Sequence, residues 1–258
     1  MSSYTNSPSM SSYTNSPYET IPDELLAGYS MNGTVPILPF FINGTNDLDQ
    51  QQWSKSYMET HVNNFTAEKI KKGKQGPEPY HCGSLWILKA VEKYGIRNKR
   101  VAVVGSLVPW IEAILLNFNN IVTTIEYNVP NVDYPNLSAI SYWDFQKTQN
   151  QYDCVVTYSS VEHSGLGRYG DPLDPDADLK TMKDIHQNLS TNGILIWGAP
   201  VGHDAVAWNA HRIYGKIRLP FLFSGFCELE WIDVNKEAVL NQPLRSNSIN
   251  PVIVLLKV

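Results

Sequence analysis

Glu162 and His163 stand side by side directly after an apolar run that has the composition of a strand. A carboxyl group beside an imidazole can move a proton near neutral pH, because histidine titrates there. A second polar segment follows the next apolar run and adds His203 and His211 as candidates for substrate contact or proton transfer. The structural alternative stays open: Glu162 would then brace its loop, and His163 would pack against the sheet.

Three further positions suit the binding of a nucleoside. Gly105 ends an apolar run and would permit a tight turn and a close backbone approach. Glu126 ends the next apolar run, 21 residues beyond Gly105, close to the spacing at which an acid meets ribose hydroxyls. Asp144 lies among aromatic residues that could hold an adenine ring, although a buried aromatic cluster with the aspartate as a helix cap is the alternative.

Short apolar strands alternating with helices must position these residues. Strands are predicted at 100–105, 121–127, 152–158 and 194–197, with helices at 83–94, 110–118 and 178–189. We expect Asp178 to cap the last of these helices and Gly193 to end it. Near-continuous apolar strands separated by helices favour a parallel sheet covered on both faces, and ligands bind such sheets beyond the carboxyl ends of the strands. Two closing runs, 229–234 and 251–258, predict an antiparallel hairpin with no helix between its strands.

This order of elements resembles the class I S-adenosylmethionine-dependent methyltransferases over about 83–258. The resemblance implies an α/β fold with a doubly wound, mostly parallel Rossmann-like sheet, and S-adenosylmethionine as the cofactor. It places Gly105 and Ser106 on the methionine and ribose side, Glu126 at the ribose hydroxyls and Asp144 near the adenine amino group. It also places Ser159 among the cofactor-binding residues.

A segment at 159–172 resembles the signature of an uncharacterised domain family assigned to this fold. The resemblance to methyltransferases implies that Glu162 and His163 face the pocket, where methyl transfer to a hydroxyl or amine needs a proton removed, with His203 and His211 as further candidate bases. One departure stands out: the first loop has Gly105 and Ser106 where the superfamily has two or three glycines. No metal site is predicted. The alternative is a divalent metal ion held by Glu162, His163 and either His203 or His211.

The composition excludes several classes of protein. Twenty lysine and arginine residues against 25 acidic residues give a net charge of −5, which argues against long nucleic acid as a partner. Three scattered cysteines argue against a disulfide framework. With no predicted secretory signal or membrane span, we expect a cytoplasmic protein that does not bind membranes and acts on a small molecule.

Three segments are predicted: a disordered polar tail with an internal repeat at 1–20, an irregular extension at 21–82, and the methyltransferase-like domain at 83–258. The leading hypothesis is methyl transfer from S-adenosylmethionine to a small or medium-sized acceptor. The alternatives are a methyltransferase-like binding or scaffold protein without catalysis, and a nucleotide-sugar or dinucleotide enzyme on a similar sheet.

Overall fold

A computed structural model describes residues 17–44, 50–78, 80, 82–242 and 249–258. Most of the predicted polar tail, residues 1–16, lies outside the described residues. Within the described part, no helix is long and apolar enough to cross a membrane.

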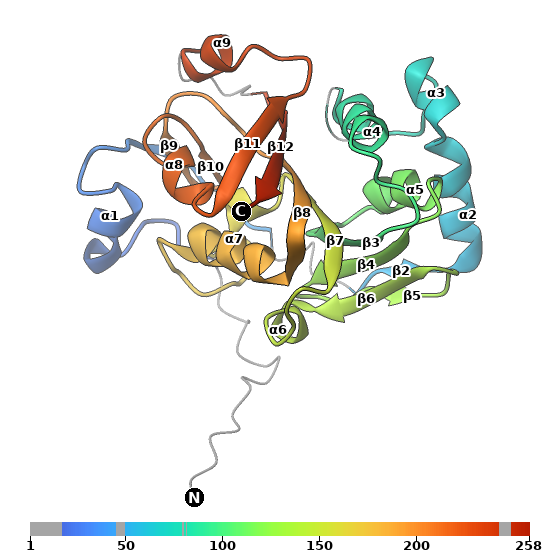
Figure 1. The fold of residues 1–258 in the computed structure, drawn as a ribbon. Helices are drawn as coiled ribbons and strands as arrows, with labels where there is room; N and C mark the ends of the chain where they lie inside the picture. Colours follow the sequence, from blue (N-terminus) through green and yellow to red (C-terminus); the bar gives the residue numbers. More distant parts are fainter. Residues whose placement is uncertain (1–16, 45–49, 79, 81, 243–248) are drawn as a thin grey trace, which may run out of the picture.

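Seven strands form the central sheet in the order β11-β12-β8-β7-β3-β4-β6 (Figure 1). The pairs from β8 to β6 are parallel, whereas β12 runs antiparallel to both β8 and β11. This confirms the predicted doubly wound α/β sheet with its C-terminal antiparallel hairpin. The strands are β3 (Arg100–Val104), β4 (Ile121–Glu126), β6 (Leu137–Ser141), β7 (Tyr152–Tyr158), β8 (Leu189–Gly198), β11 (Phe226–Trp231) and β12 (Val252–Lys257).

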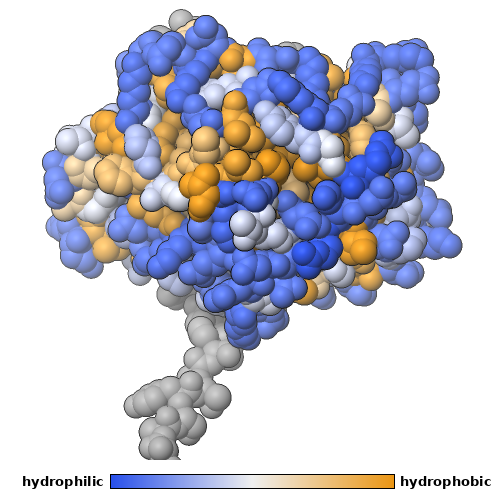
Figure 2. Space-filling model, viewed as in Figure 1, coloured by the Kyte–Doolittle hydropathy of each residue, from blue (hydrophilic) through white to orange (hydrophobic). Residues whose placement is uncertain are grey.

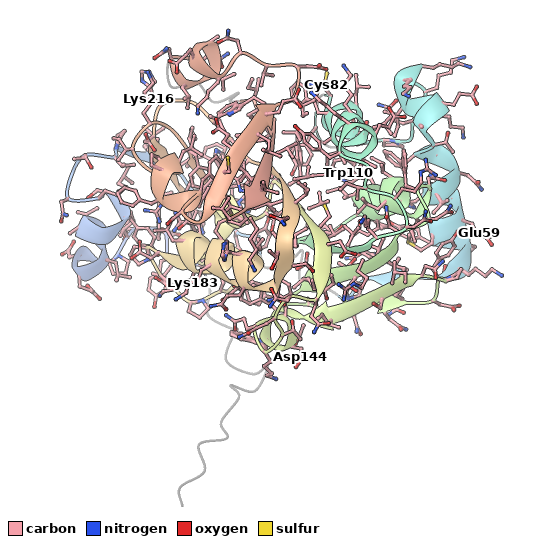
Figure 3. The ribbon with its side chains drawn as sticks, viewed as in Figure 1. Glu59, Cys82, Trp110, Asp144, Lys183 and Lys216 are labelled. Carbon is pink, nitrogen blue, oxygen red and sulfur yellow. The ribbon has the colours of Figure 1, made fainter. Side chains whose placement is uncertain are left out.

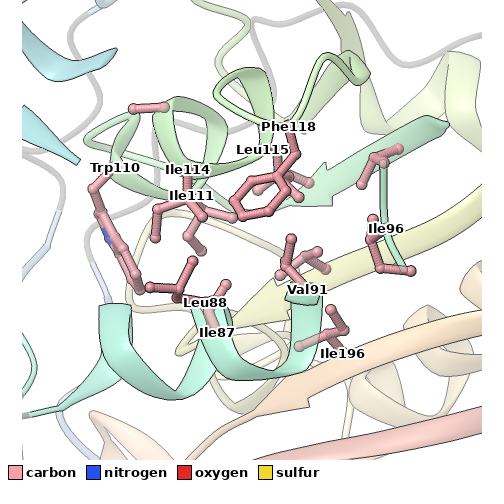
Figure 4. Close-up of a cluster of buried hydrophobic side chains, with 14 of the residues drawn as sticks. Ile87, Leu88, Val91, Ile96, Trp110, Ile111, Ile114, Leu115, Phe118 and Ile196 are labelled. Carbon is pink, nitrogen blue, oxygen red and sulfur yellow. The ribbon is translucent and has the colours of Figure 1, made fainter. Parts of the chain in front are cut away.

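Helices cover both faces of the sheet, because alternate residues of each buried strand point to opposite faces. Val101 and Val103 pack into one apolar core, whereas Ala102 and Val104 pack into the other. The first core is closed by α2 (Lys55–Asn64), α3 (Ala67–Lys71), α4 (Gly83–Lys93) and α5 (Trp110–Leu116), and Figure 4 shows the side chains of α4 and α5 interdigitating there. The second core is closed by α6 (Tyr142–Phe145), α7 (Ala177–Asn188), α8 (Leu219–Leu222) and α9 (Lys236–Leu240).

The segment predicted as an irregular extension forms regular elements that join the rest of the fold. Strand β1 (Ile37–Phe40) pairs in parallel with β9 (Ala205–Asn209), which pairs with β10 (His211–Ile213) to complete a second sheet. Strand β2 (Gln52–Trp53) pairs with β5 (Asn131–Val132). Helix α1 (Asp23–Tyr29) contributes Tyr29 to a third apolar cluster with Leu166 and Trp208. This second sheet therefore brings the N-terminal region to the residues that follow β8.

Three local predictions are wrong. The hairpin encloses a helix, α9, whose five residues are too few for a periodic pattern. Gly193 does not end α7: the helix stops at Asn188, and Gly193 lies within β8. Asp178 does not cap α7, because its buried carboxylate binds two arginine side chains from the C-terminal half instead.

Figure 2 shows that hydrophobic residues gather toward the middle of the face in view, with hydrophilic residues around them.

Candidate functional site

The carboxyl ends of β3, β4, β7 and β8 meet at one edge of the sheet, because these neighbours are parallel. The backbone N–H of Gly105 donates to the carbonyl of Ile125 at 3.1 Å, and that of Ser159 donates to the carbonyl of Gly198 at 2.8 Å. The loops that carry the predicted cofactor residues are thus joined directly beyond the strands.

Gly105 is required where the first loop meets the loop after β7. Its φ is +80°, in the left-handed region, and a Cβ atom there would lie 1.9 Å from Ser160 Oγ. No side chain fits into that space without moving the neighbouring backbone. The single glycine of this loop therefore allows close contact between two segments of the protein.

Ser106 is held from two sides by carboxylates. Its backbone N–H donates to Glu126 Oε1, and its hydroxyl donates to Glu112 Oε2 at 3.0 Å. Thr124 Oγ1 donates to the other oxygen of Glu112 at 2.9 Å. Glu112 is not among the predicted site residues, although it is the one acid within the otherwise apolar α5. These side-chain contacts stabilise a loop that has one glycine instead of several.

Burial raises the pKa of Glu112 to about 7, and the nearby Glu126 charge adds to the increase, whereas the hydrogen bonds oppose it. When an acid has a higher pKa in the folded protein than in the unfolded chain, the free energy of unfolding falls as pH rises from the unfolded pKa to the folded pKa. We expect Glu112→Gln to remove a decline of about 3 kcal/mol in unfolding free energy between pH 4.5 and pH 8. Urea denaturation at both pH values measures this, with the exposed Glu59→Gln as control. Equal declines in Glu112→Gln and the wild type would contradict the assignment.

Glu126 is half-buried at the end of β4, where it accepts hydrogen bonds from the backbone N–H groups of Ser106 and Tyr127. Burial raises its pKa. Asp144 lies at the outer edge of the molecule on α6 (Figure 3). Its side chain is 61% exposed, and hydrogen bonds from Lys147 and Ser141 lower its pKa. Glu126 ends β4 as predicted, whereas Asp144 lies within α6, which Ser141 caps rather than Asp144.

Glu162 is fully buried in the 3₁₀-helix η3 (Val161–His163) that follows β7. Ser159 Oγ donates to Glu162 Oε1 at 2.9 Å, whereas Glu162 Oε2 has no hydrogen-bond partner among the described residues. Burial raises the pKa of this carboxyl group to about 7, against the opposing effects of hydrogen bonds and the charge of Arg168. Such a group exchanges a proton readily at neutral pH.

The ring of His163 is fixed by the turn between β9 and β10. Its Nδ1–H donates to the carbonyl of Ala210 at 2.6 Å, which leaves a lone pair on Nε2, 3.6 Å from Glu162 Oε1. Burial and the charge of Arg168 lower the pKa of His163 to about 3. The imidazole is therefore neutral at pH 7, and its Nε2 is able to accept a hydrogen bond.

Of the four residues predicted as catalytic, three come together. The ring centroids of His211 and His163 are 6.4 Å apart, and burial followed by the charge of Arg168 lowers the pKa of His211. His203 is exposed in the turn before β9, and no contact among the described residues joins it to the other three. No group of three or more His, Cys, Asp or Glu side chains in the described ranges is arranged to hold a metal ion.

Asp178 anchors the loop between η3 and α7 over this site. It is fully buried and accepts from Arg218 Nε at 2.9 Å and Arg218 Nη2 at 2.6 Å. Arg212, 1% exposed, lies 3.6 Å from the same carboxylate and donates to the carbonyl of Ser164 at 2.6 Å. These contacts give Arg212 a structural role.

A model of the family described as "Caenorhabditis protein of unknown function, DUF268" matches residues 98–250. No curated protein matches the sequence significantly. The fold is similar to that of a 1,6-didemethyltoxoflavin-N1-methyltransferase from Burkholderia thailandensis, solved with 1,6-didemethyltoxoflavin and S-adenosylhomocysteine: 14% identity, TM-score 0.52, covering 78% of this chain and 89% of that chain.

The fold is also similar to that of the 4+2 cyclase SpnF, at 13% identity and a TM-score of 0.51, covering 86% of this chain and 98% of that chain. At such low identities the similarity establishes the class I methyltransferase fold, not the activity.

Proposed function

This chain belongs to the DUF268 family, and from its class I methyltransferase fold and the geometry of its strand ends we propose that it transfers a methyl group from S-adenosylmethionine to a small or medium-sized acceptor. The observation that carries the proposal is the placement of two acids, Glu126 and Glu162, at one sheet edge. Glu126 contacts the first loop, and Glu162 follows β7 with one unpartnered oxygen.

The residues present fit the cofactor. A carboxylate at the end of β4 accepts hydrogen bonds from ribose hydroxyls, and the exposed carboxylate of Asp144 accepts from an adenine amino group. Leu107 and Val108 add apolar side chains that are 48% and 40% exposed on the first loop. The similar methyltransferase of known structure holds S-adenosylhomocysteine, which supports the same ligand class for this chain.

When bound, S-adenosylmethionine supplies a methyl group on a positively charged sulfur, a strong leaving group. The protein then has to orient the acceptor and receive its proton. Glu162 Oε2 is suited to the proton because its pKa of about 7 lies near the working pH. His163 is suited to orientation, because its neutral Nε2 accepts a hydrogen bond from the acceptor.

One specific observation favours a second candidate, a binding protein without catalysis. The backbone N–H of Ser106 and the space beside Gly105 are both taken by groups of the protein itself. The fold does not require methyl transfer, since the similar SpnF is a cyclase. Binding of S-adenosylhomocysteine with no transfer to any acceptor would favour this candidate.

Calorimetric titration with S-adenosylhomocysteine tests the proposal. We expect the wild type to bind and Glu126→Ala to bind about 10- to 100-fold more weakly, because the carboxylate's hydrogen bonds to the ribose are lost. Glu59→Ala is the matched control, since Glu59 is exposed on α2 and far from this edge in Figure 3. An absence of binding, or equal affinities of Glu126→Ala and the wild type, would overturn the cofactor site.

A further inference from the structure

Two polar side chains contact the carbonyl of Ala210, in the turn between β9 and β10, and two more residues lie beside them in space or in sequence. We call these four residues the Ala210 cluster: Glu162, His163, Arg168 and Asn209. His163 Nδ1 and Arg168 Nη1 donate to this one carbonyl, at 2.6 Å and 3.3 Å. Asn209 is the preceding residue, and Glu162 Oε1 lies 3.6 Å from His163 Nε2. The cluster therefore joins η3, its following loop and the second sheet.

Three buried atoms of this cluster have no hydrogen-bond partner among the described residues: Glu162 Oε2, Arg168 Nε and Asn209 Nδ2. Glu162 and Asn209 are both fully buried. Asn209 Oδ1 accepts from the backbone N–H of Ile42 at 2.8 Å, so that its amide NH₂ is the group left over. Because buried polar groups are nearly always paired in proteins, three such atoms in one cluster indicate a ligand that supplies the partners.

The unpaired atoms differ in hydrogen-bonding sense. Arg168 Nε and Asn209 Nδ2 can only donate, whereas His163 Nε2 and ionised Glu162 can only accept. A ligand that pairs with all of these groups must therefore both accept and donate hydrogen bonds. Hydroxyl groups do both, and several neighbouring hydroxyls would pair with all four side chains.

Other ligand chemistries fit less well. A carboxylate or phosphate has no proton to give His163 or Glu162, and it would be repelled by ionised Glu162. An ammonium group would meet the positive charge of Arg168, which already disfavours the protonation of His163 and His211. A neutral ligand with several hydroxyls avoids both conflicts.

An exposed aromatic ring lies beside His211, whose own ring centroid is 6.4 Å from that of His163 in the cluster. Phe40, at the end of β1, is 51% exposed, and its ring centroid lies 6.2 Å from that of His211. Exposed aromatic rings pack against apolar C–H surfaces while polar groups pair elsewhere. A sugar ring has both kinds of surface.

We propose that the methyl acceptor is a neutral, polyhydroxylated molecule of the sugar class, held by Glu162, Arg168 and Asn209 with a hydroxyl directed to His163; this rests on the proposed function. In the transfer, a second hydroxyl, which donates to Glu162 Oε2, reacts: its oxygen forms the bond to the methyl carbon and its proton passes to Glu162 Oε2. The electron pair of the broken carbon–sulfur bond stays on sulfur.

Saturation-transfer NMR on the full chain tests this, with and without saturating S-adenosylhomocysteine. The probes are the methyl glycosides of glucose, galactose, mannose, fucose and N-acetylglucosamine, with benzoate and benzylamine as the anionic and cationic comparisons. We expect at least one glycoside to bind and neither comparison compound to do so. Binding of no glycoside, or of benzoate or benzylamine in their place, overturns the proposal.

Two conservative variants test the residues. Arg168→Lys keeps the charge but loses the Nε donor, and Asn209→Asp keeps the oxygen for Ile42 but loses the NH₂ donor. We expect each to weaken glycoside binding about tenfold or more and to leave the affinity for S-adenosylhomocysteine within about twofold of the wild type. Lys183→Ala, an exposed site on α7, is the control. Unchanged glycoside binding in both variants contradicts the proposal.

The two proposals fail separately. If S-adenosylhomocysteine does not bind but a glycoside does, and the variants weaken it, the methyltransferase function is wrong and the sugar site stands. If S-adenosylhomocysteine binds and no glycoside does, the cofactor site stands and the sugar class is wrong.

Discussion

Glu162→Gln should lower the rate of methyl transfer about 10²- to 10⁴-fold at pH 8, the range that positioned bases contribute. Glutamine keeps the shape of the side chain and can still accept from Ser159 Oγ, but it cannot take a proton. Single-turnover transfer of labelled methyl groups to the acceptor measures the rate. Glu59→Gln makes the same chemical change at an exposed position and should leave the rate unchanged.

The pH dependence gives this prediction a second readout. Only the ionised form of Glu162 can accept a proton, and burial raises its pKa to about 7. The wild-type rate should therefore rise about tenfold per pH unit below 7 and level off above it. The Glu162→Gln rate should lack this limb. A variant that keeps the wild-type rate and pH profile would show that Glu162 only braces its loop.

Asp178→Asn should destabilise the protein by about 3–5 kcal/mol, the range for breaking one side of a buried ion pair. The change leaves the guanidinium groups of Arg212 and Arg218, which are 1% and 6% exposed, without the buried anion that they share. Tyr214 also loses a charged acceptor at 3.1 Å. The midpoint of urea unfolding at pH 7 measures the effect.

The neighbouring Asp176→Asn is the control for Asp178. Asp176 is 62% exposed and lies 3.6 Å from Arg218, so that its loss should cost less than about 1 kcal/mol. Burial raises the pKa of Asp178, but the charges of Arg212 and Arg218 outweigh it and hold this pKa below the usual value of 3.8. The stabilisation from Asp178 is thus present above that value and is lost as pH falls below it. Equal stability of the two variants at pH 7 would contradict this role.

The sequence predicted the sheet well because its strands are short apolar runs that local patterns reveal. Strand β7 has the predicted bounds, and Glu126 ends β4 as expected. Positions just after parallel strands were also accessible, because strand direction fixes the edge at which they meet. Glu162 and His163 could therefore be selected without knowledge of tertiary contacts.

Long-range pairing could not be predicted in this way. Strand β1 pairs with β9 across more than 160 residues, and no local signal of Phe40 or Asn209 specifies that partner. Asp178 has the position expected of a helix cap, and only the tertiary fold brings Arg218, 40 residues later, to its carboxylate. The sequence offers His203 and His211 as equal candidates. In the structure, β10 places His211 beside His163, whereas His203 is exposed before β9.

A crystal structure of the chain with S-adenosylhomocysteine would decide whether the ligand occupies the proposed cofactor site. We expect the ribose hydroxyls at Glu126, the adenine beside Asp144 and the sulfur directed toward Glu162 and His163. A ligand bound away from the carboxyl ends of β3, β4 and β7, or its absence from crystals grown at saturating concentration, would contradict it.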